Sequence, residues 1–226
     1  MAEALGKIAE SHNGKKMVLL DVGAGESPFR SICENLGFLY KSQDFNQYIP
    51  DPERPGLQND SWNYGDHDFV CDILDIPEHD NYDVLLCTEV LEHVPDPRAV
   101  FRKLRKLGSP GAHVVITVPL HSLIHQAPFW FSSGLSPFWF QNAARDEGLL
   151  IEELFVGGDY ADFISQEVNR TLSGLQLWFP FNLAAKVLGR LVGKGARILR
   201  RLLPTSILFS GGFGTFFIGK CPERLP

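Results

Sequence analysis

The stretch VLLDVGAGESPFR, residues 18–30, decides the fold class of this chain. Together with Met17 it opens on a short, nearly continuous apolar run, which is typical of a buried parallel strand. Gly23 and Gly25 follow at once and predict a tight turn, because glycine adopts backbone conformations that other residues avoid. Ser27 and Pro28 then predict a helix start, with Ser27 as the N-cap and Pro28 in the first turn. The segment therefore predicts a strand, a tight turn and a helix.

The same alternation continues along the chain. Further strands are expected over residues 38–43, 69–71, 82–87, 113–118 and 150–156, and a last one over 214–221. Helices are expected over 97–107 and 137–148, and Ser109-Pro110-Gly111 predicts a turn between a helix and a strand. This order predicts an α/β protein with a Rossmann-like doubly wound sheet, mostly parallel with a C-terminal antiparallel strand.

The length of 226 residues suits a single domain. We expect a core over about residues 15–156, which would bind a ligand at the carboxyl ends of its strands. A helical insertion over about 160–206 would separate this core from the last strand, because the gap is too long for an ordinary hairpin loop.

Composition excludes several classes of function. Hydrophobic residues make up 44% of the chain and charged residues 21%, which are ordinary globular values. The formal charge of -6 argues against a nucleic-acid partner held by phosphate neutralisation. The four cysteines lie far apart, without a CxxC pair or a zinc-type His/Cys cluster, so a reducing compartment is the simplest interpretation.

No targeting or membrane-spanning segment is expected. The N-terminal residues 1–16 lack the apolar stretch of a signal peptide. Residues 107–144 carry no Asp, Glu, Lys or Arg, but glycines and prolines interrupt them too often for a spanning helix. We therefore expect a cytoplasmic protein, with contact to the inner face of a membrane as an open alternative.

Three acids stand at the ends of the first three predicted strands: Asp21, Asp44 and Asp72. Asp44 comes about 20 residues after the glycine turn, the spacing of a carboxylate that accepts hydrogen bonds from ribose hydroxyls. Asp72 could hold an adenine amino group. Ile73 or Phe45 could cover the face of the base. Loop capping is the structural alternative for Asp44.

Other nucleotide ligands fit the sequence less well. A dinucleotide fingerprint would need a third glycine where the chain has Pro28, which makes NAD and FAD poor candidates. The chain has no GxxxxGK[ST] motif, and acids along one rim would repel a triphosphate. The pattern instead fits a ligand that combines a cationic amine with a neutral nucleoside.

These blocks resemble the class I S-adenosylmethionine-dependent methyltransferases, in particular the common methyltransferase-domain group. The resemblance covers about residues 15–156 and is carried by VLLDVGAGESPFR (18–30), SQDF (42–45), CDILDIP (71–77), YDVLLCTEVLEHVPDP (82–97) and LGSPGAHVVITVP (107–119). It implies S-adenosylmethionine as the cofactor. Ser27 departs from the pattern, because many members of the family carry a third glycine there.

The resemblance also implies roles for individual residues. Asp21, Gly23 and Gly25 would line the methionine portion of the cofactor, Asp44 would bind its ribose, and Asp72 with Ile73 its adenine. Thr88 and Glu89 would close over the cofactor after the fourth strand. No metal is required by this interpretation.

Methyl transfer to a hydroxyl would also benefit from a general base, and histidine is the residue type best suited to that role at neutral pH. The candidates are His93, His121 and His125, which follow the fourth and fifth predicted strands. The structural alternative for His93 is a hydrogen bond to the backbone that fixes its loop. His121 and His125 could equally orient the substrate.

Two further segments bear on the acceptor. PFWF occurs at residues 128–131 and again at 137–140, which fits core packing under a lid, an apolar acceptor pocket or an interfacial patch. Residues 170–203 carry seven basic residues and no acid, with apolar residues at helical spacing. That segment could lie on an anionic membrane surface or form an amphipathic lid.

The sequence thus predicts an enzyme that transfers a methyl group from S-adenosylmethionine to an oxygen, or as second choice a nitrogen, of an acceptor. The acceptor would be a small molecule or a glycan, with a lipid-linked one allowed by the basic insertion. Similar sequences often accompany sugar and polysaccharide biosynthesis. The alternative is an inactive cofactor-binding or membrane-peripheral accessory protein.

Overall fold

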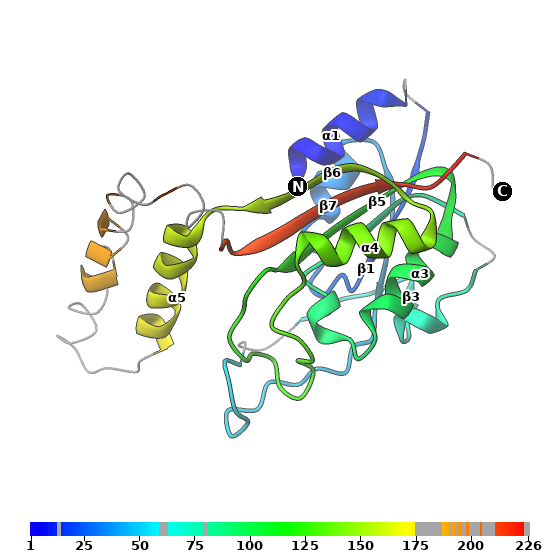
Figure 1. Cartoon of the computed structure of the whole chain (residues 1–226). Helices are drawn as coiled ribbons and strands as arrows, with labels where there is room; N and C mark the ends of the chain where they lie inside the picture. The colour runs from blue at the N-terminus through cyan, green and yellow to red at the C-terminus, as the bar shows by residue number, and fades with distance from the viewer. Residues whose placement is uncertain are drawn as a thin grey trace.

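A seven-stranded mixed sheet forms the centre of the computed structural model (Figure 1). The structure describes residues 1–12, 15–58, 63–78, 81–174, 187–189, 191–192, 194–195, 198, 204 and 211–223. The strands are β1 (Val18–Val22), β2 (Leu39–Asp44), β3 (Phe69–Val70), β4 (Tyr82–Thr88), β5 (Gly108–Pro119), β6 (Leu150–Gly157) and β7 (Gly214–Lys220).

The strand order is β3-β2-β1-β4-β5-β7-β6. Strand β7 runs antiparallel to both of its neighbours, and the pairs among β1 to β5 are parallel. The fold-class prediction is therefore confirmed, including the antiparallel C-terminal strand. The order reverses between β1 and β4, and in sheets of this type ligands bind at such a switch point.

Helices cover both faces of the sheet. They are α1 (Ala2–Ser11), α2 (Arg30–Asn35), α3 (Pro97–Leu107), α4 (Pro137–Glu147) and α5 (Tyr160–Gly174), with 3₁₀ turns η1 (Ile73–Asp75) and η2 (Leu91–His93). Side chains from α1 and α2 pack with one face, and side chains from α3 and α4 with the other. Both cores draw on neighbouring positions of the same strands, such as Leu19 and Leu20, because successive strand residues point to opposite faces.

The second PFWF segment belongs to the core. Phe140 is fully buried, stacks on Phe217 with ring centroids 5.1 Å apart, and packs with Trp139 against Phe101. Phe138 is exposed on the opposite side of α4. The core-packing interpretation is therefore confirmed for Trp139 and Phe140, but not for Phe138.

Two local predictions were wrong. Ser27 does not cap a helix: α2 begins at Arg30, and its N-cap position is Phe29 without a side-chain cap bond. Ser27 instead extends the glycine turn with φ at +53°, and its amide donates to the Ala24 carbonyl. Residues 109–111 are not a separate turn, because β5 already begins at Gly108, paired with Tyr82 ahead of a register shift.

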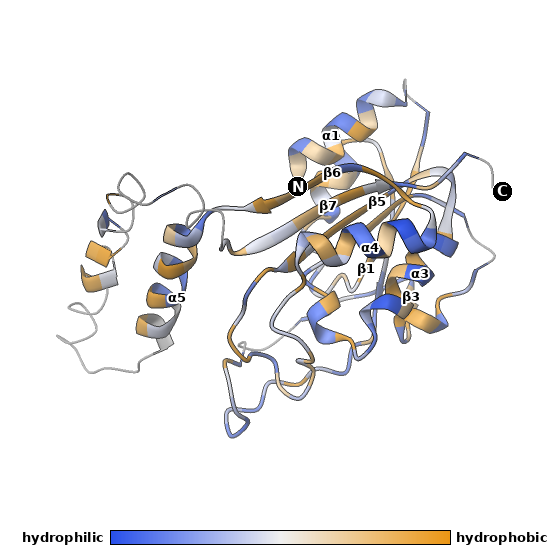
Figure 2. Ribbon diagram, in the orientation of Figure 1, coloured by the Kyte–Doolittle hydropathy of each residue, from blue (hydrophilic) through white to orange (hydrophobic). Residues whose placement is uncertain are grey.

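The segment between β6 and β7 begins with α5, which lies beyond the carboxyl end of β6 (Figure 1). Most of the basic segment of residues 170–203 falls outside the described residues. Hydrophobic colouring follows β5, β6 and β7 through the middle of the molecule, whereas α3 and α4 show hydrophilic patches (Figure 2). Within the described residues, we find no helix with the length and apolar character needed to cross a bilayer.

Candidate active site

The carboxyl ends of the central strands surround two adjoining cavities. The smaller cavity, of about 270 Å³, lies against β2 and η1. The larger one, of about 710 Å³, extends from the glycine turn toward β5 and α5. Gly23, Glu89, His93 and Gln126 line both, so the two cavities meet at these residues. The sequence-predicted site residues converge on this edge of the sheet.

The glycine turn after β1 is tied to the end of β2 by backbone donors. The Gly23 amide donates to Gln43 Oε1 over 3.1 Å, and the Gly25 amide donates to Asp44 Oδ2 over 2.9 Å. Gly23 has φ at +68°, and a Cβ there would lie 2.5 Å from a methyl carbon of Val90. Glycine is thus required at position 23 both by backbone conformation and by the close approach of Val90.

Four predicted residues line the smaller cavity but not the larger one: Asp44, Phe45, Asp72 and Ile73. The Asp44 carboxylate is 5% exposed and also accepts from the Asn46 amide over 2.9 Å, so loop capping, the structural alternative, is present as well. Asp72 is exposed and caps η1 by accepting from the Leu74 amide over 2.8 Å.

Aromatic rings form much of the remaining wall of the smaller cavity. Phe129 meets Phe45 edge to face, with ring centroids 5.0 Å apart, and Phe131 lies on the same wall. The first PFWF segment therefore differs from the second, because its phenylalanines face a cavity and not the core. Such rings suit the faces of a flat heterocycle.

Asp21 lies beneath the site and lines neither cavity. It is 1% exposed, and the Tyr40 hydroxyl donates to its Oδ2 over 2.6 Å. Burial raises the pKa of Asp21 to about 7, and the nearby charge of Asp44 adds to this effect. The structure thus separates Asp21 from Asp44 and Asp72, which are open to a ligand.

The larger cavity collects the remaining predicted residues. Gly25, Thr88 and Glu89 line it beside the shared Gly23, and so do all three candidate histidines. His121 is exposed, and its ring lies 5.6 Å from that of Phe163 on α5. Gln166 and Phe213 also line this cavity, so the segment between β6 and β7 contributes to its wall.

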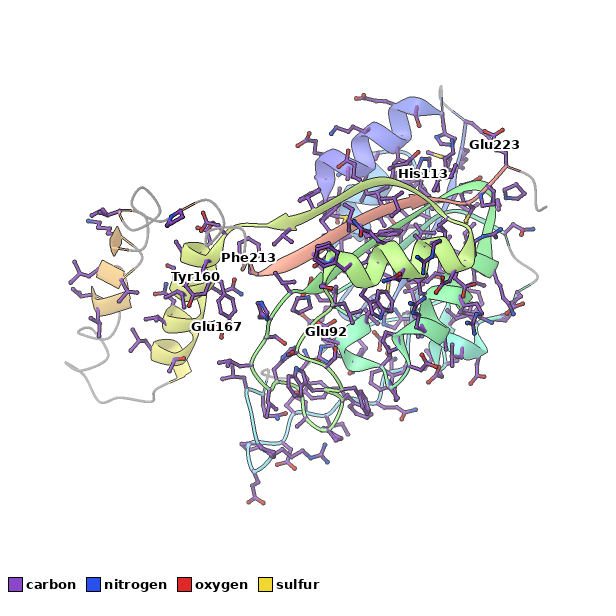
Figure 3. All side chains as sticks on the ribbon, viewed as in Figure 1. Glu92, His113, Tyr160, Glu167, Phe213 and Glu223 are labelled. Atoms are coloured by element: carbon purple, nitrogen blue, oxygen red, sulfur yellow. The ribbon has the colours of Figure 1, made fainter. Side chains whose placement is uncertain are left out.

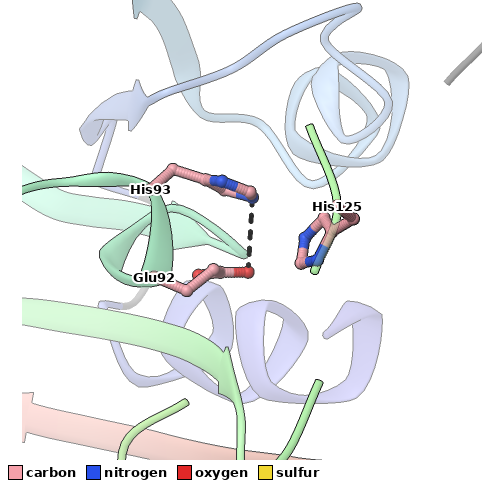
Figure 4. A group of neighbouring side chains, drawn as sticks. All are labelled: Glu92, His93 and His125. Atoms are coloured by element: carbon pink, nitrogen blue, oxygen red, sulfur yellow. Dashed lines mark ion pairs between the residues drawn. The ribbon is translucent and has the colours of Figure 1, made fainter. Parts of the chain in front are cut away.

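His93 and His125 lie deeper, next to Glu92 (Figure 4). Their rings meet edge to face with centroids 4.8 Å apart, and His93 Nε2 lies 3.7 Å from Glu92 Oε1. His93 Nδ1 bonds the Phe129 carbonyl, and His125 Nδ1 bonds the Leu123 carbonyl at 2.9 Å. The backbone bond that the sequence offered as the alternative role of His93 is therefore present.

Glu92 is a buried acid in an unusual setting. It is 1% exposed, and neither carboxylate oxygen has a hydrogen-bond partner among the described residues. Burial, with the nearby charge of Glu89, raises the pKa of Glu92 to about 8. Burial also lowers the pKa of His93 to about 4. In Figure 3, Glu92 and Phe213 lie toward one end of the sheet, and His113 and Glu223 lie toward the other end.

Sequence reasoning missed several residues of the site. Gln43 accepts from the Gly23 amide, and its Nε2 donates to the Cys71 carbonyl over 2.7 Å, so it links three strand ends. An amide side chain at the end of a buried strand was the available signal. Gln126 carried no such signal, because a long loop brings it to the cavities. Phe129 lies in the first PFWF segment, which the sequence marked as a possible pocket wall but did not assign to the cofactor.

A family model described as a methyltransferase domain matches residues 1–153. The ubiquinone biosynthesis O-methyltransferase of Yersinia pestis (strain Pestoides F) is 55% identical over 38 residues, which are 17% of this chain and 15% of that protein. The chain thus matches only a small part of this curated relative.

Solved structures match over nearly the whole chain but at low identity. A proposed sarcosine dimethylglycine methyltransferase from Galdieria sulphuraria has a TM-score of 0.58 at 17% identity, covering 99% of this chain and 86% of that one. The phosphoethanolamine N-methyltransferase 2 of Haemonchus contortus, solved with S-adenosyl-L-methionine, has a TM-score of 0.54 at 16% identity, covering 97% and 52%. At these identities the likeness shows a shared fold.

Proposed function

Since the chain belongs to the methyltransferase-domain family, we propose that it is an S-adenosylmethionine-dependent methyltransferase that methylates an oxygen of a small-molecule or glycan acceptor. The observation that carries this proposal is the pair of joined cavities, which meet at Gly23, Glu89, His93 and Gln126. A nucleoside in the smaller cavity would direct the sulfonium methyl toward the larger one.

The smaller cavity suits the nucleoside. Asp44 offers a carboxylate to ribose hydroxyls, and its position is fixed by the Gly25 amide. Asp72 and Ile73 line the far part of the cavity, where the adenine would lie beside the rings of Phe45 and Phe129. The methionine portion would then pass Gly23 and Gly25, where the glycine turn permits close approach to the backbone.

The larger cavity suits a hydroxyl acceptor. The sulfonium methyl is already electrophilic, so the main task of the enzyme is to align a nucleophile with the S–CH₃ bond. We assign the role of general base to His121, because it lines the cavity and is exposed enough to pass a proton to solvent. His93 and His125 already use Nδ1 for bonds to backbone carbonyls, and we assign them no proton transfer.

Exposed apolar side chains near the larger cavity bear on the nature of the acceptor. Leu123 and Ile124 are exposed and lie in sequence between Ser122 and His125, which line the cavity, and Phe213 lines it beside α5. These apolar side chains favour an acceptor with an apolar portion, such as a lipid-linked glycan. A short amphiphilic alcohol would meet the same chemistry.

The test is methyl transfer from labelled S-adenosylmethionine to a panel of lipid-linked sugars and small alcohols. Matched acceptors with the hydroxyl already methylated, or replaced by an amine, serve as controls. We expect label in hydroxyl acceptors only, with kcat lowered at least about a hundredfold in His121→Asn. Transfer to amines alone would overturn the oxygen assignment. Cofactor binding without transfer to any acceptor would support the accessory-protein alternative.

A further inference from the structure

Glu92, His93 and His125 form a cluster of three potential metal ligands on the wall of the larger cavity. One ligand atom from each residue lies within 4.8 Å of the others. Glu92 and His93 come from η2, and His125 reaches them from the loop after β5 (Figure 4). We propose that this cluster binds a divalent transition-metal ion, such as Zn²⁺ or Mn²⁺, with a coordination position open to the cavity.

The first argument is the state of Glu92. Its carboxylate is buried, and neither oxygen has a hydrogen-bond partner among the described residues. Leaving a buried acid unsatisfied is costly, and buried charges in proteins are normally paired or coordinate metals. A metal cation bound to Glu92 would give its oxygens a partner and would balance the charge of the buried carboxylate.

The second argument is the orientation of the two imidazoles. In both His93 and His125, Nδ1 faces a backbone carbonyl, which can only accept a hydrogen bond. The proton of each neutral ring is therefore assigned to Nδ1, which leaves the lone pair on Nε2. Metal-binding histidines show this same arrangement, in which the second nitrogen donates to a carbonyl and fixes the ring.

The donor set indicates the class of metal. Two imidazoles and one carboxylate suit zinc, manganese or ferrous iron better than an all-oxygen ion such as calcium. Ligand atoms around bound zinc lie about 3.3 Å apart, so the side chains would close by about 1 Å when the ion binds. Glu89 lines the same cavity and could add a further oxygen ligand.

Such an ion would also bind the acceptor. This part of the proposal rests on the proposed function. Bound to the open position, an acceptor hydroxyl would have a lowered pKa and lose its proton to His121. The oxygen would then form the O–CH₃ bond as the S–CH₃ bond breaks. The electron pair of the broken bond stays on sulfur, giving neutral S-adenosylhomocysteine, and His121 releases the proton to solvent.

The experiment measures metal binding directly, without cofactor or acceptor. The full chain is freed of metal with a chelator and titrated calorimetrically with Zn²⁺ and with Mn²⁺. The same titrations use Glu92→Gln, His125→Asn and, as the matched control, His121→Asn, which changes a histidine of the same cavity outside the cluster. The absorption spectrum of the Co²⁺ form reports whether a cysteine thiolate takes part.

We expect one equivalent to bind the unchanged chain and His121→Asn, with affinity at least about a hundredfold weaker in the two cluster variants. Bound metal should also raise the Tm of the unchanged chain but not of His125→Asn. Failure of the unchanged chain to bind a metal ion, equal binding by folded cluster variants, or a thiolate band would overturn the proposal. If Glu92→Gln fails to fold, His125→Asn decides.

Titration of the metal-free chain with S-adenosylmethionine separates this proposal from the proposed function. Cofactor binding with no metal binding would remove the metal site alone. Metal binding with no cofactor binding would leave the cluster in place and contradict the assignment of the two cavities.

Discussion

The backbone amide of Gly25 donates to the carboxylate of Asp44 over 2.9 Å. This bond joins the turn after β1 to the end of β2, which are distant in sequence but neighbours in the parallel sheet. It leaves the second oxygen, Oδ1, to accept from the Asn46 amide at the start of the following loop. One acid therefore shapes the glycine turn and, in our proposal, also receives the ribose.

Substitution of Asp44 by alanine should abolish cofactor binding. The change removes the proposed ribose acceptor and the partner of the Gly25 amide together, so we expect S-adenosylmethionine to bind at least about a hundredfold more weakly. Calorimetric titration with S-adenosylmethionine and S-adenosylhomocysteine measures this. Asp146→Ala, on the exposed surface of α4, is the control. Unchanged affinity in folded Asp44→Ala would remove Asp44 from the site.

Gly23 and Gly37 form a matched pair for testing the glycine turn. Both have positive φ, but an added Cβ meets Val90 at Gly23 and open space at Gly37. We expect Gly37→Ala to lose about 1 kcal/mol of unfolding free energy from backbone strain alone. Gly23→Ala should lose more and bind S-adenosylmethionine at least about tenfold more weakly. Adding Val90→Ala should recover part of the lost stability, and equal effects of the two single changes would contradict the steric argument.

One phenylalanine from each PFWF segment, Phe129 and Phe140, should show opposite effects when it is substituted. Phe129 lines the smaller cavity, so Phe129→Ala should weaken S-adenosylmethionine binding roughly tenfold with little loss of stability. Phe140 is fully buried, so Phe140→Leu should lower the free energy of unfolding by about 1 kcal/mol and leave the affinity unchanged. Urea unfolding and calorimetric titration separate the two. A loss of affinity in Phe140→Leu alone would reverse the assignment.

The sequence predicted the fold because its signals are local and agree with one another. The apolar strand over residues 17–22 and the glycines after it contain enough information to place β1 and the turn. The sequence could not predict the role of Ser27. Whether a serine caps a helix or extends a turn depends on bonds to Ala24 and the end of β2. Helix α1 was not predicted either, although Leu5 and Ile8 are buried against the sheet.

The candidate site was predicted where residues follow strands directly, as Asp44, Asp72 and Glu89 do. The cluster of Glu92, His93 and His125 was not recognised, because its members come from two segments and only the folded loop after β5 brings them together. Two of the three were noted as separate candidate bases. The burial that leaves Glu92 without a hydrogen-bond partner among the described residues has no signature in the sequence.

The buried Asp21 should make stability depend on pH. Burial raises its pKa in the folded protein to about 7 from an ordinary value of 3.8. Between these two values the folded protein holds a proton that the unfolded chain has lost, so the contribution of Asp21 to stability falls as pH rises through this window. Asp21→Asn keeps the size and an oxygen acceptor for Tyr40 but does not titrate, so it should lose less stability between pH 5 and pH 8.

The difference in that loss between the unchanged chain and Asp21→Asn should be on the order of 2 kcal/mol. Urea unfolding at about pH 5 and pH 8 measures it, with the free energy extrapolated to water for both proteins. All other titrating groups are common to the two chains, so the difference isolates Asp21. Asp146→Asn, whose carboxylate lies half exposed on α4, should follow the unchanged chain. Parallel pH dependence in the unchanged chain and Asp21→Asn would show that Asp21 is already ionised at pH 5, with Tyr40 compensating its burial.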